Sequence, residues 1–174
     1  MSTDNPPARR FDALRQFLIS FPDWEEYGLA PPTGKFVGLS QIAAGSFGKA
    51  AGTTQLALQY TGSSPVRTGS DPLFATYVRG DRQVTRQASF DFLIMQRSVT
   101  SGERADMTEF LWAFTEWLDA QAHAGTAPKM GDEPATERIW ATNGGTIGIH
   151  EEGKASLYLL NIHIEYIKHY DPIF

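Results

Sequence analysis

The chain has 174 residues, of which 41% are hydrophobic and 20% charged, and its formal net charge at pH 7 is -5. This length and composition are typical of one globular domain. The lack of cysteine excludes a disulfide framework, a thiolate metal site and a cysteine nucleophile. The acidic balance and the scattered basic residues argue against a general nucleic-acid-binding protein.

The N-terminal part of the chain is expected to pass from disorder into a helix. Residues 1–8 are polar, contain two prolines and offer little to bury, so we predict that they are disordered. Residues 9–21 place apolar side chains at steps of three and four, which predicts an amphipathic helix that Pro22 ends. Residues 23–32 are expected to form a packed loop. No signal peptide and no membrane-spanning segment is indicated, so a soluble protein made in the cytoplasm is expected.

Residues 34–54 are rich in glycine and alanine, and their pattern is ambiguous. A short strand over residues 35–42 is possible, followed by a mobile Gly/Ala-rich loop at about residues 43–53. Residues 55–60 alternate polar and apolar side chains, which predicts a strand. The motif Gly62-Ser63-Ser64-Pro65 is expected to break it.

The middle of the chain predicts a β-hairpin followed by a long helix. Residues 73–79 and 83–98 favour two strands joined by a tight turn at Gly80-Asp81. Apolar residues on both faces at the end of the second strand predict that this part of the sheet is covered on both sides. The apolar stripe of residues 107–118 predicts a helix that covers the inner face of the sheet.

The ends of that helix are marked by local signals. Thr100 and Glu103 have the spacing of a capping box before the helical stripe. Gly125 followed by Pro128 indicates that the helix has ended.

The C-terminal segment predicts two hairpin turns. Residues 136–141 and 146–150 alternate in the manner of strands on either side of a turn at Asn143-Gly144-Gly145. A second turn over residues 151–154 leads into a last strand over residues 157–166. One face of this strand is apolar, with Tyr158, Leu160, Ile162, Ile164 and Tyr166. The opposite face mixes polar and apolar side chains, namely Leu157, Leu159, Asn161, His163 and Glu165.

Several positions are candidates for contacts with other subunits. Trp112 falls opposite the buried stripe of its helix, and interfaces are enriched in aromatic residues. Glycine-rich segments often order on binding a partner. The predicted subunit or tube interface therefore comprises Gly45, Phe47, Gly80, Asp81, Trp112, Leu157, Leu159, Asn161 and His163. Cover of the last strand's outer face by another element of the same chain is the alternative.

No residue pattern predicts catalysis, a metal site or a cofactor. The motif His150-Glu151-Glu152 has metal-binding residue types, but its position favours a solvated hairpin tip. His163 and Glu165 share one strand face and can act as an acid and base pair only if a pocket covers them. A small ligand-binding domain or enzyme that uses these two residues is therefore the alternative from a different class.

The order of landmarks in the C-terminal half resembles a family of tailed-bacteriophage minor capsid proteins, the tail terminators of long non-contractile tails. The landmarks are Phe114-x-x-Trp117-Leu118-x-x-Gln121, Gly125-x-x-Pro128, Ile139, Asn143-Gly144-Gly145, and Ala155-x-x-Tyr158 leading to Ile162-His163-Ile164-Glu165-Tyr166. Upstream, Tyr77-Val78-Arg79-Gly80-Asp81, Arg86-Gln87 and Phe90-x-Phe92 are similar to that family's central hairpin. The N-terminal helix also fits, whereas residues 36–54 are longer and richer in glycine and alanine.

The resemblance implies a single α+β domain over residues 9–170. Its sheet would be mostly antiparallel or mixed, with the N-terminal helix and one long central helix on one face. The subunits would form a hexameric ring in the virion neck, at the head-tail junction. This ring would cap the major tail tube protein, stop tube polymerisation and attach the head connector or stopper protein. DNA would pass through its lumen without specific binding. Another neck component or a tail-tube subunit is the alternative within this class.

Overall fold

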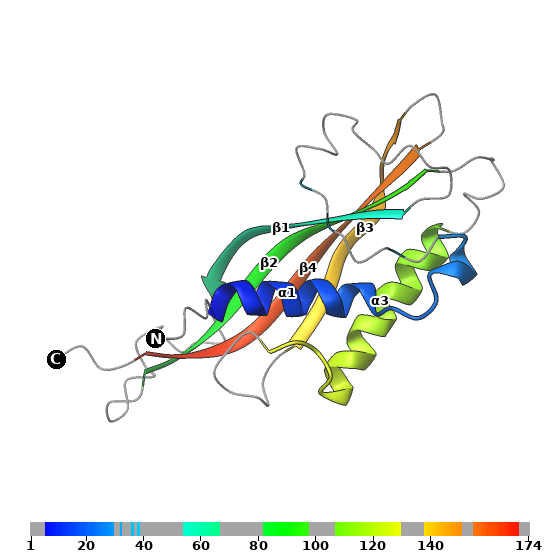
Figure 1. Cartoon of the computed structure of the whole chain (residues 1–174). Helices are drawn as coiled ribbons and strands as arrows, with labels where there is room; N and C mark the ends of the chain where they lie inside the picture. The colour runs from blue at the N-terminus through cyan, green and yellow to red at the C-terminus, as the bar shows by residue number, and fades with distance from the viewer. Residues whose placement is uncertain are drawn as a thin grey trace.

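The computed structural model of the protein describes residues 6–29, 32, 36, 38, 54–66, 82–97, 107–129, 138–150 and 155–170. In this part of the chain, two α-helices pack against one face of a four-stranded antiparallel sheet (Figure 1). This arrangement confirms the predicted α+β fold with helices on one side of the sheet.

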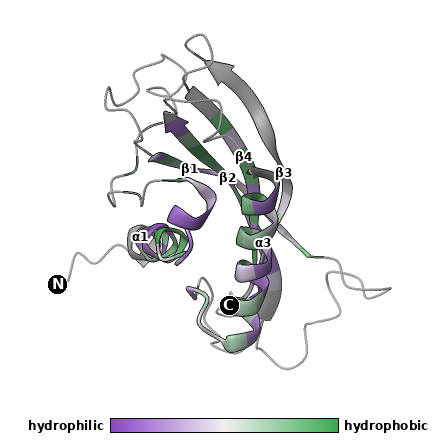
Figure 2. Ribbon diagram, turned by 90° about the vertical axis from the view of Figure 1, so that its right-hand side faces the viewer, coloured by the Kyte–Doolittle hydropathy of each residue, from purple (hydrophilic) through white to green (hydrophobic). Residues whose placement is uncertain are grey.

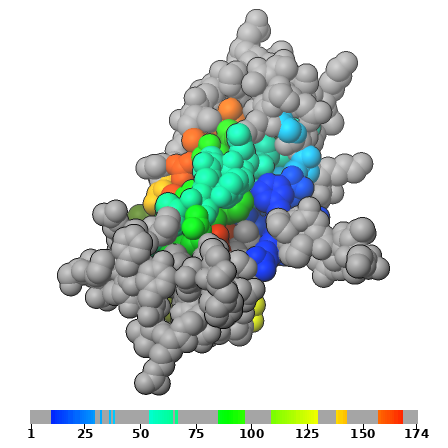
Figure 3. Space-filling model, turned by 90° about the vertical axis from the view of Figure 1, so that its left-hand side faces the viewer, coloured from blue at the N-terminus to red at the C-terminus, as the bar shows by residue number. Residues whose placement is uncertain are grey.

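The sheet has the strand order β1-β2-β4-β3. Its strands are β1 (Thr54–Pro65), β2 (Arg82–Arg97), β3 (Arg138–His150) and β4 (Ala155–Tyr170). Each neighbouring pair is antiparallel, and the long strands β2 and β4 lie in the centre. Figure 3 shows β1 at the surface, with α1 on one side of it and β2 and β4 on the other.

The register brings the apolar residues of all four strands to one face, here called the inner face. Phe92 lies opposite Leu58 on β1 and Leu160 on β4, and all three side chains are buried. Ile139 on β3 lies opposite Ile164 in the same way. Because side chains alternate along a strand, the residues between these positions form the outer face.

The two helices supply the second layer of the core. α1 (Pro6–Ile19) and α3 (Met107–Ala124) are both amphipathic, as the alternating colours of their ribbons in Figure 2 show. Their buried side chains pack on the inner face of the sheet, and they are Leu14, Leu18, Phe110, Leu111, Phe114 and Leu118. α1 begins at Pro6 instead of the predicted residue 9, because proline is tolerated in a first helical turn.

An aromatic cluster joins the end of α1 to α3. The ring of Phe21 lies 5.2 Å from that of Phe114, 5.8 Å from that of Phe110 and 5.6 Å from that of Trp117. Phe17 stacks on Trp117 with a centroid distance of 4.8 Å. These contacts hold the two helices against each other over the sheet.

The loop predicted over residues 23–32 contains the short 3-10 helix η1 (Glu25–Tyr27). Gly28 ends it with a φ of 72°, a left-handed conformation that glycine adopts at little cost. The side-chain amide of buried Gln96 donates a hydrogen bond to the carbonyl oxygen of Gly28. This bond ties the loop to β2.

The predicted end of α3 is confirmed. Gly125 follows the last helical residue with a φ of 70°. Its N–H donates to the carbonyl oxygen of Ala122, and the N–H of Thr126 donates to that of Gln121. These bonds satisfy carbonyl groups that a helix end otherwise leaves unpaired.

Two predicted chain breaks are wrong. β1 does not stop at Gly62-Ser63-Ser64-Pro65 but pairs with β2 through Pro65, with a register shift between Tyr60 and Gly62. Similarly, Asn143-Gly144-Gly145 lies inside β3, with register shifts between Thr142 and Gly145 and between Thr146 and Gly148. At each of these three shifts a bulge absorbs one extra residue. In β1, Gly62 adopts a φ of 146°, which glycine tolerates.

Some sequence predictions fall outside the described residues. These are most of residues 35–42, the loop 43–53, the strand 73–79, the turn Gly80-Asp81 and the capping box. Phe36 is described, and it forms an isolated parallel bridge to Leu56 of β1.

Candidate functional site

The outer face of the sheet carries a connected group of polar side chains. Pairing of β2, β4 and β3 aligns Ser89, His163 and Trp140 in one row across three strands. The neighbouring row contains Asp91, Asn161 and Thr142. Residues far apart in the sequence therefore meet on one surface because of the strand order.

His163 lies at the centre of this polar group. Its Nδ1 atom lies 3.1 Å from Nε2 of Gln87 and 3.0 Å from the hydroxyl oxygen of Ser89. Its Nε2 atom lies 2.8 Å from the hydroxyl oxygen of Thr142. Because an amide NH₂ group only donates, Nδ1 accepts from Gln87, and Nε2 carries the proton that is donated to Thr142.

The environment of His163 favours the neutral imidazole. Burial lowers the pKa of His163 below its ordinary value of 6.5. The ring also lies 5.4 Å from that of Trp140, its neighbour on β3. The imidazole is therefore fixed by hydrogen bonds at both nitrogens and by the ring contact with Trp140.

The surface continues from Trp140 to Arg138 and from His163 to Asn161. The guanidinium carbon of Arg138 lies 5.6 Å from the centroid of the Trp140 ring. Asn161 donates a hydrogen bond of 2.7 Å from Nδ2 to the carboxylate of Asp91. This polar half of the outer face is thus formed by side chains that bind one another.

The other half of the outer face is apolar. Ala57, Leu93, Met95 and Leu157 form a small cluster of buried side chains, with Leu159 packed against it. This confirms the prediction that the end of β2 is covered on both sides. Leu157 is only 8% exposed, so it offers little surface to a partner.

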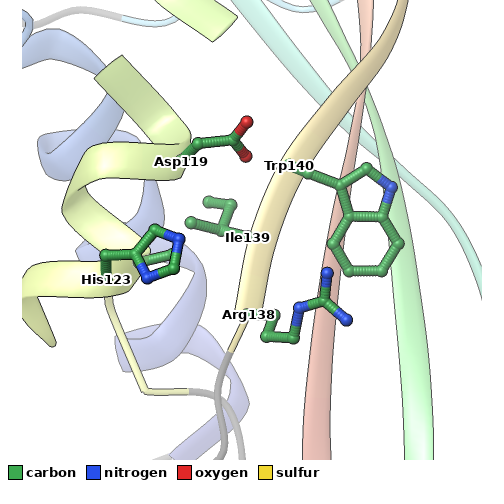
Figure 4. A pocket seen from close by; sticks show the side chains of 6 residues that line it. Asp119, His123, Arg138, Ile139 and Trp140 are labelled. Atoms are coloured by element: carbon green, nitrogen blue, oxygen red, sulfur yellow. The ribbon is translucent and has the colours of Figure 1, made fainter. Parts of the chain in front are cut away.

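A pocket of about 280 Å³ lies between α3 and the edge strand β3. Figure 4 shows Asp119 and His123 on the helix side, and Arg138, Ile139 and Trp140 along the strand. Ala122 completes the lining. The pocket therefore combines acidic, basic, aromatic and apolar groups beside β3, the last strand of the described sheet.

The predicted interface residues do not all lie together. Asn161 and His163 belong to the polar half of the outer face, and Leu157 and Leu159 to the apolar half. Trp112 lies on α3, where 68% of its side chain is exposed, as its helical position predicts. Gly45, Phe47, Gly80 and Asp81 are outside the described residues.

Sequence reasoning did not identify the partners of His163. Gln87, Ser89, Trp140 and Thr142 each occupy an outward position of an alternating strand, which was the available signal. Only the strand order and register bring them to one place.

Three further findings bear on the kind of site. Within the described residues, His, Asp and Glu side chains form no group of three that could hold a metal ion. The metal-type residues Glu151 and Glu152 lie outside that part of the chain. None of the described helices is long and apolar enough to cross a membrane.

The chain was also compared with known proteins. It matches no model of a protein family and no curated protein.

Proposed function

We propose that this protein is a structural subunit that acts through protein contacts, and specifically a bacteriophage tail terminator. The order of sequence landmarks that resembles this family motivates the specific assignment. The broader assignment, that of a structural subunit, rests on the position of both helices on one side of the sheet. Both helices lie on the inner face of the sheet, while the outer face has a polar half beside its buried apolar half, and β3 is the last strand at one edge.

In this proposal, subunits close into a hexameric ring on the finished tail tube. Such a ring needs a heterologous contact that repeats around an axis. It blocks further addition of tube protein and presents its free side to the head connector or stopper. The net charge of -5 suits a lumen through which DNA slides without being held.

The hydrogen bonds of His163 connect the three strands of the polar half of the outer face. Nδ1 is engaged by Gln87 and Ser89, and Nε2 is engaged by Thr142. A general base needs a lone pair directed at the proton that it removes. In the alternative of a small ligand-binding domain or enzyme that uses His163 and Glu165, a bound substrate would have to replace one of these partners.

The proposal is tested by the mass of the purified protein across concentration, joined to negative-stain images. We expect closed rings with about six times the 19.3 kDa mass of one chain. Open-ended tubes would instead identify a tail-tube subunit. A protein that stays monomeric at every concentration, and also in the presence of tail tubes, contradicts the terminator assignment.

The alternative from the other class is tested by native mass spectrometry. It predicts a stoichiometric small molecule or metal ion on the wild type that is lost when His163 and Glu165 are both replaced by alanine. Replacement of Gln16 on α1 and Glu25 on η1, which are both exposed and lie outside the pocket, provides the control.

A further inference from the structure

The exposed face of α3 carries a tryptophan among carboxylates. Trp112 is 68% exposed. Glu109 and Glu116 stand three residues before it and four residues after it, so they lie on the same side of the helix, and both are exposed. An exposed aromatic ring between two negative charges is the starting point of this inference.

The loop around η1 adds to the same surface. Tyr27 packs against Phe110 of α3, with a distance of 5.9 Å between the ring centroids. Burial, and then the negative charges of Glu26, Asp23, Glu109 and Glu116, raise the pKa of the Tyr27 hydroxyl. η1 contacts α3 at this place (Figure 1), and carboxylates from both segments act on the same hydroxyl group. We call this surface the acidic-aromatic patch, and it comprises Asp23, Glu26, Tyr27, Glu109, Trp112 and Glu116.

Trp112 is held in place by its own helix. Its indole N–H donates a hydrogen bond of 2.6 Å to Oε1 of Glu116. The polar atom of the side chain is therefore satisfied, whereas most of the ring surface faces solvent. A pre-oriented, exposed tryptophan is the residue type that contributes most strongly to protein interfaces.

We propose that the acidic-aromatic patch binds a basic protein surface, with an arginine or lysine of the partner lying over the Trp112 ring and facing Glu109 and Glu116. An aromatic face attracts a cation, and the neighbouring carboxylates add complementary charge. The chain itself contains this type of contact, since the guanidinium of Arg138 lies over the ring of Trp140.

This inference rests on the proposed function for the identity of the partner, because a terminator must recognise a tube or connector protein. It adds that the recognised surface is basic. Pairing of two copies through the same patch is unfavourable, since it would bring two sets of carboxylates together. Nucleic acid is a poor occupant of the patch, because its phosphates carry the same sign of charge.

The test uses ¹⁹F NMR of the full-length protein labelled with 5-fluorotryptophan. The chain has four tryptophans, and Trp112→Phe assigns the resonance of interest. The probe is a twelve-residue peptide of alternating arginine and glycine, and the matched peptide replaces arginine with glutamate. We expect the arginine peptide to shift the Trp112 resonance in a salt-sensitive manner, while the Trp140 resonance stays in place.

Variants identify the groups that bind. Glu109→Gln together with Glu116→Gln is expected to weaken peptide binding by about tenfold. Asp12→Asn is the control, because Asp12 is an exposed carboxylate on α1 that pairs with Arg15. Equal weakening by the control would show non-specific charge attraction and overturn the proposal.

Other outcomes also overturn it. They are an unchanged Trp112 resonance, an equal shift with the glutamate peptide, and a shift with a DNA oligonucleotide alone. A Trp112 shift on raising the protein concentration without peptide would assign the patch to a second copy instead. Ring formation is measured separately by light scattering. Specific peptide binding without rings or tail capping would therefore overturn the terminator assignment alone, and rings without peptide binding would overturn this inference alone.

Discussion

The Nε2 atom of His163 on β4 lies 2.8 Å from the hydroxyl oxygen of Thr142 on the edge strand β3. The other ring nitrogen is bound to side chains of β2. One imidazole thus connects three strands on the outer face of the sheet. The strands are long and pair over many residues, so strand pairing holds the sheet together. The hydrogen bonds of His163 instead fix the positions of the side chains on the outer face.

Stability is expected to fall with acid because of His163. Burial lowers the pKa of this group in the folded state below its ordinary value of 6.5. Between these two pKa values the unfolded chain binds a proton that the folded chain does not, so the free energy of unfolding rises with pH. Thermal denaturation at about pH 5 and about pH 7.5 should show a higher midpoint at the higher pH.

The variant His163→Gln isolates this contribution. It keeps hydrogen-bonding capacity but cannot titrate, so the difference between the two midpoints should become smaller than in the wild type. His123→Gln, at an exposed position on α3, should leave the difference unchanged. A wild-type pH dependence that persists in His163→Gln would show that other groups cause it.

The bond between Asn161 and Asp91 should be measurable as a coupling between β4 and β2. Its length is 2.7 Å, and both side chains are half-buried. A double-mutant cycle with Asn161→Ala and Asp91→Ala, followed by urea denaturation, should give a coupling free energy of about 1 kcal/mol. A coupling indistinguishable from zero contradicts a stabilising bond.

Two aromatic positions of α3 should respond very differently to truncation. Phe114 is fully buried and contacts Phe21, Phe92 and Phe110. Phe114→Ala is expected to lower the free energy of unfolding by about 3–5 kcal/mol, because it removes buried surface and leaves a cavity. Trp112→Ala, at an exposed position, should change it by less than about 1 kcal/mol. Similar losses in both variants, measured by urea denaturation, would contradict the orientation of the helix.

The end of α3 should tolerate asparagine better than alanine. Gly125 has a φ of 70°, and a Cβ added there meets no atom within 4 Å. Gly125→Ala is therefore expected to cost about 1 kcal/mol through backbone strain alone, whereas Gly125→Asn should cost less, because asparagine adopts the left-handed conformation more readily. Equal midpoints in urea denaturation for the two variants would argue against this strain.

The secondary structure was largely predictable because it depends on local periodicity. The three- and four-residue steps of α1 and α3 and the alternation of β2 and β4 repeat over many residues. The helix end at Gly125 was also predictable, since it depends on the conformation of one residue. The predicted breaks at Gly62-Ser63-Ser64-Pro65 and Asn143-Gly144-Gly145 were wrong. Turn-type residues also permit bulges, and a paired neighbouring strand can stabilise the extended form.

The sequence by itself determined where the helices and strands lie, which of their faces are apolar and that Trp112 is exposed, because each follows from spacing within one element. Only the tertiary structure decided that His163 meets Ser89 and Trp140, because strand order and register depend on contacts between distant segments. Likewise, only the tertiary structure brings the carboxylates of the η1 segment and of α3 near Tyr27. Packing of the loop after α1 against a helix far along the chain brings those charges together.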